Sequence, residues 1–366
     1  MSGPARRSRI ALVVAVALVA GQLASGSAAL APSTAAATPT LAQLVGQKLV
    51  VRMDGTIPTA SLLGRIRRGE IGGVILFGAN ITTRTALIAL THRLHHAAID
   101  GGQPPLLIAV DQEGGRVKRI PWAPPTLSPP AMGSLDSTAT AHRQGSQTGV
   151  ALRALGIDVD VAPVADVPAS TSSFLYRQHR TWSFSASRTS LLANAFSAGL
   201  RSAGVVPSMK HFPGLGLATL NTDLHLVSIR ASRTALAPGL LPYRVAIAAG
   251  APLIMLSNAT YSAYDPYAAA GWSPAINTTL LRTRLGFRGV TITDGLDGTA
   301  ASRGLTTAHV AYRAARAGTD MLLVTGSELT SRGVYAALLA AARAGSIPLA
   351  LLRASWTRIM ALKAGR

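Results

Sequence analysis

Polar side chains close several strongly apolar runs of this sequence. Asp111, Asn258 and Asp294 each follow such a run, and Lys210 and His211 end another. A charge at the end of an apolar strand is costly to bury unless it is paired or used. Carboxylates accept hydrogen bonds and can act as nucleophiles, whereas lysine and histidine donate. If these ends converge on one rim, they predict a polar pocket; otherwise each simply terminates its strand in solvent.

Eight short apolar, β-branched runs recur along the chain, and each is followed by a stretch with helical spacing. Continuous apolar runs that alternate with helices are typical of parallel strands buried on both faces. The predicted strands are Leu49–Met53, Gly73–Phe77, Leu106–Asp111, Asp158–Val164, Val205–His211, Leu253–Asn258, Val290–Asp294 and Met321–Thr325. The predicted helices include Thr83–Ala98, Ser187–Ala203, Thr234–Ala249, Ala308–Ala317 and Thr330–Ala344.

Eight strand–helix units in about 330 residues favour a closed (β/α)₈ TIM barrel of the α/β class, formed as a single domain over residues 41–366. The alternative is an open doubly wound sheet. Such a sheet usually has a glycine-rich phosphate-binding turn after its first strand, and Met53-Asp54-Gly55-Thr56 is not one. In a barrel, the carboxyl ends of the strands and the loops after them form the active site.

Three motifs carry a resemblance to a known family. They are Asp111-Gln112-Glu113-Gly114-Gly115-Arg116-Val117, Lys210-His211-Phe212-Pro213-Gly214 and the run from Gly286 to Asp294. Gly72–Phe77 and Ala162–Val167 support them. Together these segments resemble glycoside hydrolase family 3, in particular its single-barrel β-N-acetylhexosaminidase branch. The resemblance extends from about Leu41 to Lys363 and implies a TIM-barrel glycosidase.

Glycoside cleavage passes through an oxocarbenium-like state and needs an anion or nucleophile at the anomeric carbon and a proton donor for the leaving oxygen. The resemblance implies that Asp294 is the nucleophile and that the configuration is retained. The alternative for Asp294 is a helix N-cap.

The resemblance also implies a sugar-binding set. Asp111, Arg116, Lys210 and His211 correspond to family residues that line the pocket for the sugar at the cleavage site. Arg180 corresponds to a further family arginine, with Arg180-Thr181-Trp182-Ser183 in place of an Arg-x-aromatic-Gly segment. Taken singly, an arginine or lysine here could be a surface charge, and His211 a core histidine.

The acid/base is expected to be His225, paired with Asp223 in Asp223-Leu224-His225. The resemblance implies this role, and histidine suits it because a pKa of about 6.5 allows both donation and acceptance of a proton near neutral pH. The loop from Leu215 to Thr222 is about two residues longer than the family pattern, and Leu215 occupies a position where histidine is common. Asp223 could instead bind sugar or support the loop, and His225 could be a loop residue without a catalytic part.

The expected function is therefore a retaining exo-acting β-N-acetylglucosaminidase that acts on peptidoglycan fragments or related glycans. One alternative is a β-glucosidase or β-xylosidase of the same family; those enzymes usually carry an additional C-terminal domain. The other is a catalytically impaired glycan-binding protein. Gly295 and Asn258 replace an acidic residue and a histidine that are frequent in the family, which bears on substrate identity. We predict no cofactor and no metal, because His92, His95 and His96 have the spacing of a helix face without carboxylates at ligand spacing.

The N-terminal residues and the net charge indicate where the protein is located and what it binds. Arg6, Arg7 and Arg9 precede an apolar run, which predicts an export signal over residues 1–31, followed by a flexible linker over 32–40. A membrane anchor is the alternative. The chain contains no cysteine, and 35 Lys and Arg against 15 Asp and Glu give a net charge of +20. Such a surface favours anionic wall polymers, whereas scattered arginines speak against specific nucleic-acid binding. We expect a secreted or cell-wall-associated monomer.

Overall fold

The computed structural model describes residues 1–3 and 38–365. The predicted export signal, apart from its first three residues, and most of the predicted linker lie outside the described residues. Residues 39–366 form one compact unit, to which the following description applies. In the described part of the chain, every helix is too short or too polar to cross a membrane.

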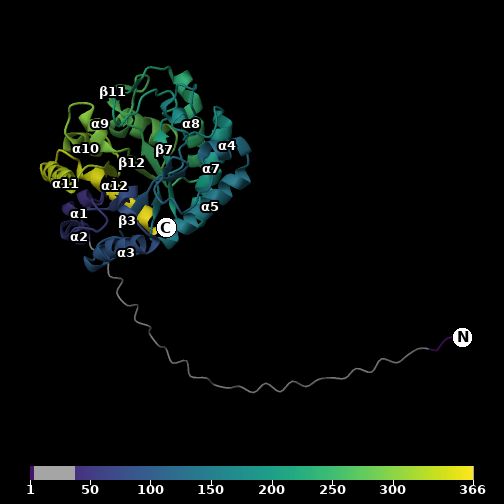
Figure 1. Ribbon diagram of the computed structural model, residues 1–366, viewed down its shortest axis with the longest axis horizontal. Helices are drawn as coiled ribbons and strands as arrows, with labels where there is room; N and C mark the ends of the chain where they lie inside the picture. The colour runs from purple at the N-terminus through teal and green to yellow at the C-terminus, as the bar shows by residue number, and fades with distance from the viewer. Residues whose placement is uncertain (4–37, 366) are drawn as a thin grey trace. The chain divides into compact units, whose positions relative to one another are not determined.

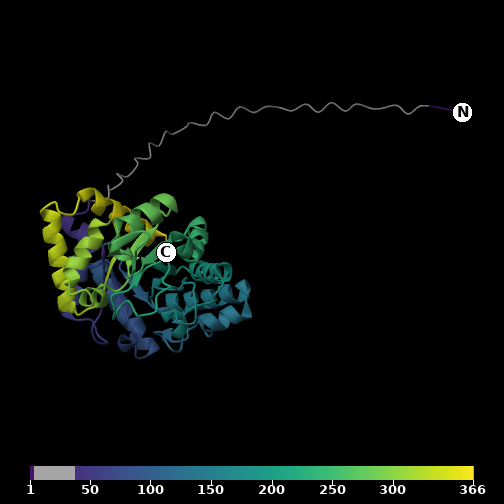
Figure 2. The ribbon, with the colours of Figure 1, turned by 90° about the horizontal axis from the view of Figure 1, so that it is seen from above.

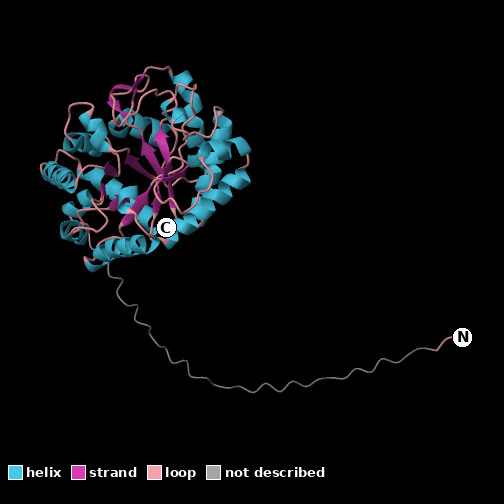
Figure 3. Cartoon of the chain, in the orientation of Figure 1, coloured by secondary structure: helices cyan, strands magenta, loops and turns pink. Residues whose placement is uncertain are grey.

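Eight parallel strands form a closed barrel at the centre of this unit (Figures 1 and 3). They pair in chain order, and a bridge between Ile292 and Met321 joins the last two strands and closes the ring. The predicted (β/α)₈ barrel is thereby confirmed. The strands are β1 (Leu49–Arg52), β2 (Gly73–Leu76), β3 (Leu107–Val110), β6 (Val159–Asp160), β7 (Val206–Phe212), β9 (Leu253–Leu256), β12 (Val290–Thr293) and β13 (Leu322–Val324).

Each strand lies within or next to a predicted run, because a parallel strand covered on both faces needs apolar side chains on both. The fourth strand is shorter than the predicted Asp158–Val164: regular pairing covers only Val159 and Asp160, and Val164 forms an isolated bridge to Lys210. Pro163 lacks the N–H that a ladder requires, which interrupts the strand.

Helices surround the barrel, and their starts follow a simple local rule. Threonine or serine caps most of them: the side chains of Thr83, Ser185 and Ser232 each accept a hydrogen bond from the third residue of the helix. The longer helices are α2 (Ala60–Arg67), α3 (Arg84–Asp100), α5 (Thr138–Ala154), α7 (Ala186–Ser202), α8 (Arg233–Ala248), η3 (Ala275–Arg284, a π-helix), α10 (Thr307–Arg316), α11 (Glu328–Arg343) and α12 (Leu349–Ala364). Shorter ones are α1 (Leu41–Gly46), η1 (Gly78–Asn80), α4 (Pro129–Leu135), α6 (Phe174–Arg177), η2 (Ala270–Trp272) and α9 (Leu296–Ala301). The five predicted helices are confirmed.

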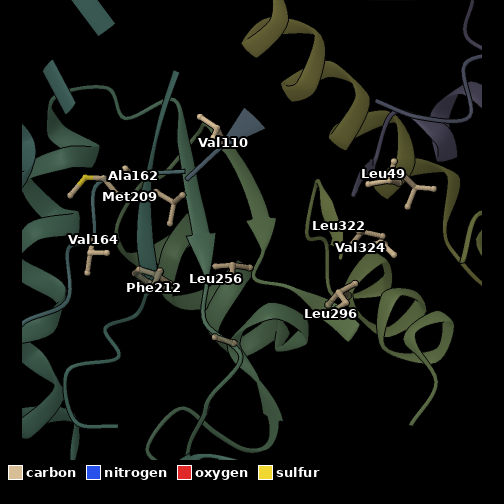
Figure 4. Close-up of a cluster of buried hydrophobic side chains, with 14 of the residues drawn as sticks. Leu49, Val110, Ala162, Val164, Met209, Phe212, Leu256, Leu296, Leu322 and Val324 are labelled. Carbon is tan, nitrogen blue, oxygen red and sulfur yellow. The ribbon is translucent and has the colours of Figure 1, made fainter. Parts of the chain in front are cut away.

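Buried apolar side chains form two layers. Alternate strand residues such as Val110 and Leu256 point outward and pack beneath the helices (Figure 4). Their neighbours, such as Ala109 and Met255, fill the barrel interior. In Figures 1 and 2 the last helices, in yellow, lie beside the first, in purple, in agreement with the pairing of β1 with β13.

Helix α12 closes the amino-terminal end of the barrel. Ile359 of α12 packs into the barrel core. Arg358 donates to the carboxylate of Asp320, which precedes β13, at 2.7 Å, and Arg282 donates to its other oxygen at 2.6 Å. With this end closed, the opposite end of the barrel is open for a site.

Candidate active site

A cavity of about 850 Å³ opens at the carboxyl ends of the strands. It is lined by Asp111, which follows β3, by Lys210 and His211 at the end of β7, and by Asp294, which follows β12. Arg116, Arg180 and Asp223 also line it. The structure therefore brings together every site residue predicted from the sequence except His225.

A buried ion network holds one wall of the cavity. Lys210 donates to Asp111 at 2.7 Å and contacts Glu113 at 2.7 Å, and Arg180 donates to both oxygens of Glu113 at 2.8 and 2.7 Å. Burial alone would raise the pKa of Glu113, but Arg180 and Lys210 outweigh it and lower the pKa to about 2. Glu113 is thus an internal anion that fixes two cations at the cavity wall.

Lys210 stays a cation in spite of its burial. Burial alone would lower its pKa, but the carboxylates of Asp111 and Glu113 raise it above the ordinary value. The pKa of Arg180 is likewise raised, because Glu113 outweighs the effect of burial. Charged donors and the carboxylate of Asp111, which remains partly accessible, form a surface suited to sugar hydroxyls, which donate and accept directionally.

His211 links the floor of the cavity to Asp294. Its Nδ1 lies 2.7 Å from Oδ2 of Asp166, and its Nε2 lies 4.0 Å from Oδ2 of Asp294. Asp166 also accepts hydrogen bonds from the main-chain N–H of His211 at 3.1 Å and of Leu215 at 2.5 Å. When Nδ1 carries a proton it donates to Asp166, so Asp166 fixes the orientation of the imidazole ring.

Asp294 extends the line of β12 into the cavity. Its main-chain N–H donates to the carbonyl of Leu256 at 3.0 Å, as the next residue of the strand would. Its Oδ1 accepts from the N–H of Gly295 at 2.8 Å, and the side chain is 19% exposed. The N-cap of α9 is Gly295, so the alternative of Asp294 as the helix N-cap does not hold. Asn258 is buried outside the cavity lining and donates to the carbonyl of Gly295 at 2.8 Å.

The loop after β7 presents Asp223 and His225 differently. Asp223 is exposed at the cavity mouth and lines it, together with Leu224. The protein that surrounds the mouth and the Asp294 carboxylate raise the pKa of Asp223 to about 6. His225 is exposed and is absent from the residues that line the cavity; its main-chain N–H bonds to the carbonyl of Asn221 at 2.9 Å. Of the predicted pair, Asp223 therefore lines the cavity and His225 does not.

Sequence reasoning missed three functional groups. Glu113 and Asp166 stand inside motifs that the sequence singled out, and the detectable signal was a carboxylate in an otherwise apolar or glycine-rich segment. Arg119 lies eight residues after Asp111. Its Nη2 is 3.7 Å from Oδ2 of Asp111, and its guanidinium stands 5.5 Å from the centre of the Phe77 ring. Arg119 and Phe77 both line the cavity, so this arginine adds a further hydrogen-bond donor to the cavity wall.

Comparisons with known proteins agree with this geometry. The model of the glycosyl hydrolase family 3 N-terminal domain matches residues 40–362. An uncharacterized secreted glycosyl hydrolase of Arthroderma benhamiae is 32% identical over 88% of this chain and 93% of its own length. A β-N-acetylhexosaminidase structure from Beutenbergia cavernae is 34% identical, with a TM-score of 0.82 over 90% of this chain and 99% of its own.

A family 3 β-N-acetylglucosaminidase structure from Paenibacillus is 29% identical, with a TM-score of 0.85. That match covers 90% of this chain and 63% of the Paenibacillus chain. The family model matches most of the described barrel, including each strand that carries a residue of the cavity. The chain therefore belongs to glycosyl hydrolase family 3, and it is a glycoside hydrolase.

Proposed function

We propose that this glycoside hydrolase is a retaining exo-β-N-acetylglucosaminidase that removes terminal residues from peptidoglycan-type glycans through a covalent glycosyl-aspartate. The observation that carries the proposal is Asp294, a carboxylate at the end of a barrel strand that shares one cavity with cationic donors and with Asp111. The sugar class is supported by the relatives from Beutenbergia cavernae and Paenibacillus, which are described as acting on N-acetylhexosamine and N-acetylglucosamine units.

In this mechanism one oxygen of Asp294 attacks the anomeric carbon while the bond to the leaving oxygen breaks. The other oxygen stays bound to the N–H of Gly295, which stabilises the developing ester geometry. Asp111, Lys210 and Arg180 hold the sugar hydroxyls, and Arg116 and His211 complete the wall. The proton comes from the loop after β7, which carries Asp223 and His225. Water then attacks the anomeric carbon from the side that the leaving group vacated, the bond from that carbon to the Asp294 oxygen breaks, and the configuration is retained overall.

The same proposal covers location and partners. Export through the predicted signal is supported by the secreted relative from Arthroderma benhamiae. The net charge of +20 supports contact of a monomer with anionic wall polymers. These are surface properties and leave the chemistry in the cavity unchanged.

The test is hydrolysis by the full chain of an aryl β-N-acetylglucosaminide, with the aryl β-glucoside and β-xyloside alongside. We expect turnover of the first with the β-anomer as the first product in a proton NMR time course, and a loss of more than about a thousandfold in Asp294→Asn. Asp136→Asn is the matched control, because Asp136 is exposed and pairs with Arg188 at the surface.

Other outcomes separate the alternatives. Faster turnover of the glucoside or xyloside would assign the chain to the other enzyme branch. Binding of N-acetylglucosamine oligomers without turnover of any of the three substrates would indicate a glycan-binding protein and contradict the proposal.

A further inference from the structure

We infer that Asn258 and Arg303 are positioning residues for the nucleophile. Together they hold the main chain at Gly295, whose N–H binds one oxygen of Asp294, although neither of them lines the cavity. This inference rests on the proposed function, in which Asp294 attacks the anomeric carbon. It adds a support for that carboxylate from outside the sugar pocket.

The first step of the argument is the contact between Asp294 and the residue after it. Oδ1 of Asp294 accepts from the N–H of Gly295 at 2.8 Å, which leaves Oδ2 to face the anomeric carbon. Among the described residues, no other group donates a hydrogen bond to this carboxylate. Glycine has no β-carbon to restrict its main chain. The direction of the nucleophile therefore depends on what else holds Gly295.

The second step is that the end of β9 holds the main chain on both sides of this contact. Before it, the N–H of Asp294 donates to the carbonyl of Leu256 at 3.0 Å. After it, Nδ2 of Asn258 donates to the carbonyl of Gly295 at 2.8 Å. Asn258 is 1% exposed, so water does not compete for this bond. The two bonds fix the peptide groups that flank the N–H of Gly295.

The third step is that Arg303 holds Asn258 in turn. Arg303 lies just beyond the end of α9, and its Nη2 donates to the main-chain carbonyl of Asn258 at 3.0 Å. Its guanidinium also stands 5.2 Å from the centre of the Trp272 ring, which limits where it can lie. Asn258 thus contacts Gly295 at the start of α9 and Arg303 after its end. The helix that leads away from the nucleophile is tied to β9 at both ends.

The stability of the fold does not by itself account for a cation at position 303. Burial lowers the pKa of Arg303, and the like charge of Arg313 lowers it further. Among the described residues, none of the ion pairs includes Arg303. Partial burial of a charge without a counter-ion costs free energy. The contact with Asn258, and through it with Gly295, is a reason for keeping the guanidinium in this place.

The test measures the attack of Asp294 separately from sugar binding, with full-length variants at 25 °C. The kcat/KM on an aryl β-N-acetylglucosaminide reports the attack, and the inhibition constant of N-acetylglucosamine reports binding in the ground state. Asn258→Ala removes the donor to Gly295 and should lower kcat/KM by about ten- to a hundredfold. Arg303→Met removes the cation and should lower it by about tenfold. In both variants the inhibition constant should stay within about twofold, because the sugar pocket keeps its own residues.

Three further variants distinguish positioning from general support. Arg303→Lys keeps the cation and one donor, and it should recover kcat/KM to within about threefold of the wild type. Arg313→Met is the matched control: it removes the same charge from neighbouring α10 and should leave kcat/KM unchanged. The double variant of Asn258→Ala with Arg303→Met should lose no more than Asn258→Ala alone, because Arg303 acts through Asn258.

Four results would overturn the inference. They are full kcat/KM in Asn258→Ala and Arg303→Met, losses that multiply in the double variant, an inhibition constant that rises in step with the loss, and an equal loss in Arg313→Met. If Asn258→Ala does not fold, the comparison of Arg303→Met with Arg303→Lys decides the matter. Failure of the proposed function is recognised separately, because the wild type would then not hydrolyse the aryl substrate, or Asp294→Asn would keep full activity, and the inference would fall with it.

Discussion

Replacing Glu113 with glutamine probes the buried anion that fixes Lys210 and Arg180. The substitution keeps the shape and removes the charge. Arg180 would lose the carboxylate that receives both of its side-chain hydrogen bonds, whereas Lys210 would keep Asp111 at 2.7 Å. Removing one partner of a buried ion pair costs about 3 to 5 kcal/mol, because the remaining charge stays buried without compensation.

The proton affinity of Glu113 gives an independent magnitude. Its pKa is about 2 in the folded protein and 4.5 for an ordinary glutamate. At about 1.4 kcal/mol per tenfold change, the folded protein favours the ionised form by roughly 3 kcal/mol. Because the folded pKa is the lower one, this stabilisation is fully present above pH 4.5 and is lost as the pH falls toward 2. Both routes therefore predict a loss of about 3 kcal/mol or more at pH 7.

The assay is urea unfolding of wild type and Glu113→Gln, followed by circular dichroism, between pH 5 and 7. The difference in unfolding free energy should be constant over that range and shrink below pH 4.5. Asp136→Asn is the control, since that carboxylate pairs with Arg188 at the surface and its loss should change stability by less than about 1 kcal/mol. A loss of under about 1 kcal/mol in Glu113→Gln would refute the reasoning.

Three further substitutions address other parts of the account. Asp166→Asn should lower kcat/KM by about ten- to a hundredfold in the aryl assay, because it weakens the charge-assisted bond that orients His211. Asp320→Asn, at the closed end of the barrel, should cost about 3 kcal/mol in urea unfolding and leave kcat/KM at 25 °C unchanged, since neither Asp320 nor its arginine partners line the cavity. Gly298→Ala should lower kcat/KM on the disaccharide N,N′-diacetylchitobiose at least about tenfold, because the new methyl group would lie 2.4 Å from the carbonyl oxygen of Asp223 and displaces that main chain. Full disaccharide activity in Gly298→Ala would contradict the seating of the loop.

The barrel could be predicted because its strands are buried on both faces. Such strands consist of continuous apolar residues, as in Leu253–Leu256, and the polar residue that follows indicates the rim. The exact extent of β6 could not be predicted in the same way, because the apolar run continues through Pro163 while the hydrogen-bond ladder does not.

The sequence alone predicts a residue of the site where that residue directly follows a strand, as Asp111 and Asp294 do. The sequence does not predict a residue's role where that role depends on side chains that are distant in the chain. Glu113 gains its role from Arg180, 67 residues away, and Asp166 from His211, 45 residues away. The orientation of Asp223 depends on a contact with α9, and no local spacing encodes such a contact.

The most direct test of the central claim is to trap the covalent intermediate. A 5-fluoro-N-acetylglucosaminyl fluoride slows both steps, so the glycosyl-enzyme should accumulate, and peptide mass spectrometry should locate the added sugar. The account predicts one sugar per chain, attached to the peptide that contains Asp294, and none in Asp294→Asn. Attachment to another residue, or turnover of this reagent by the wild type with inversion and without any adduct, would contradict it.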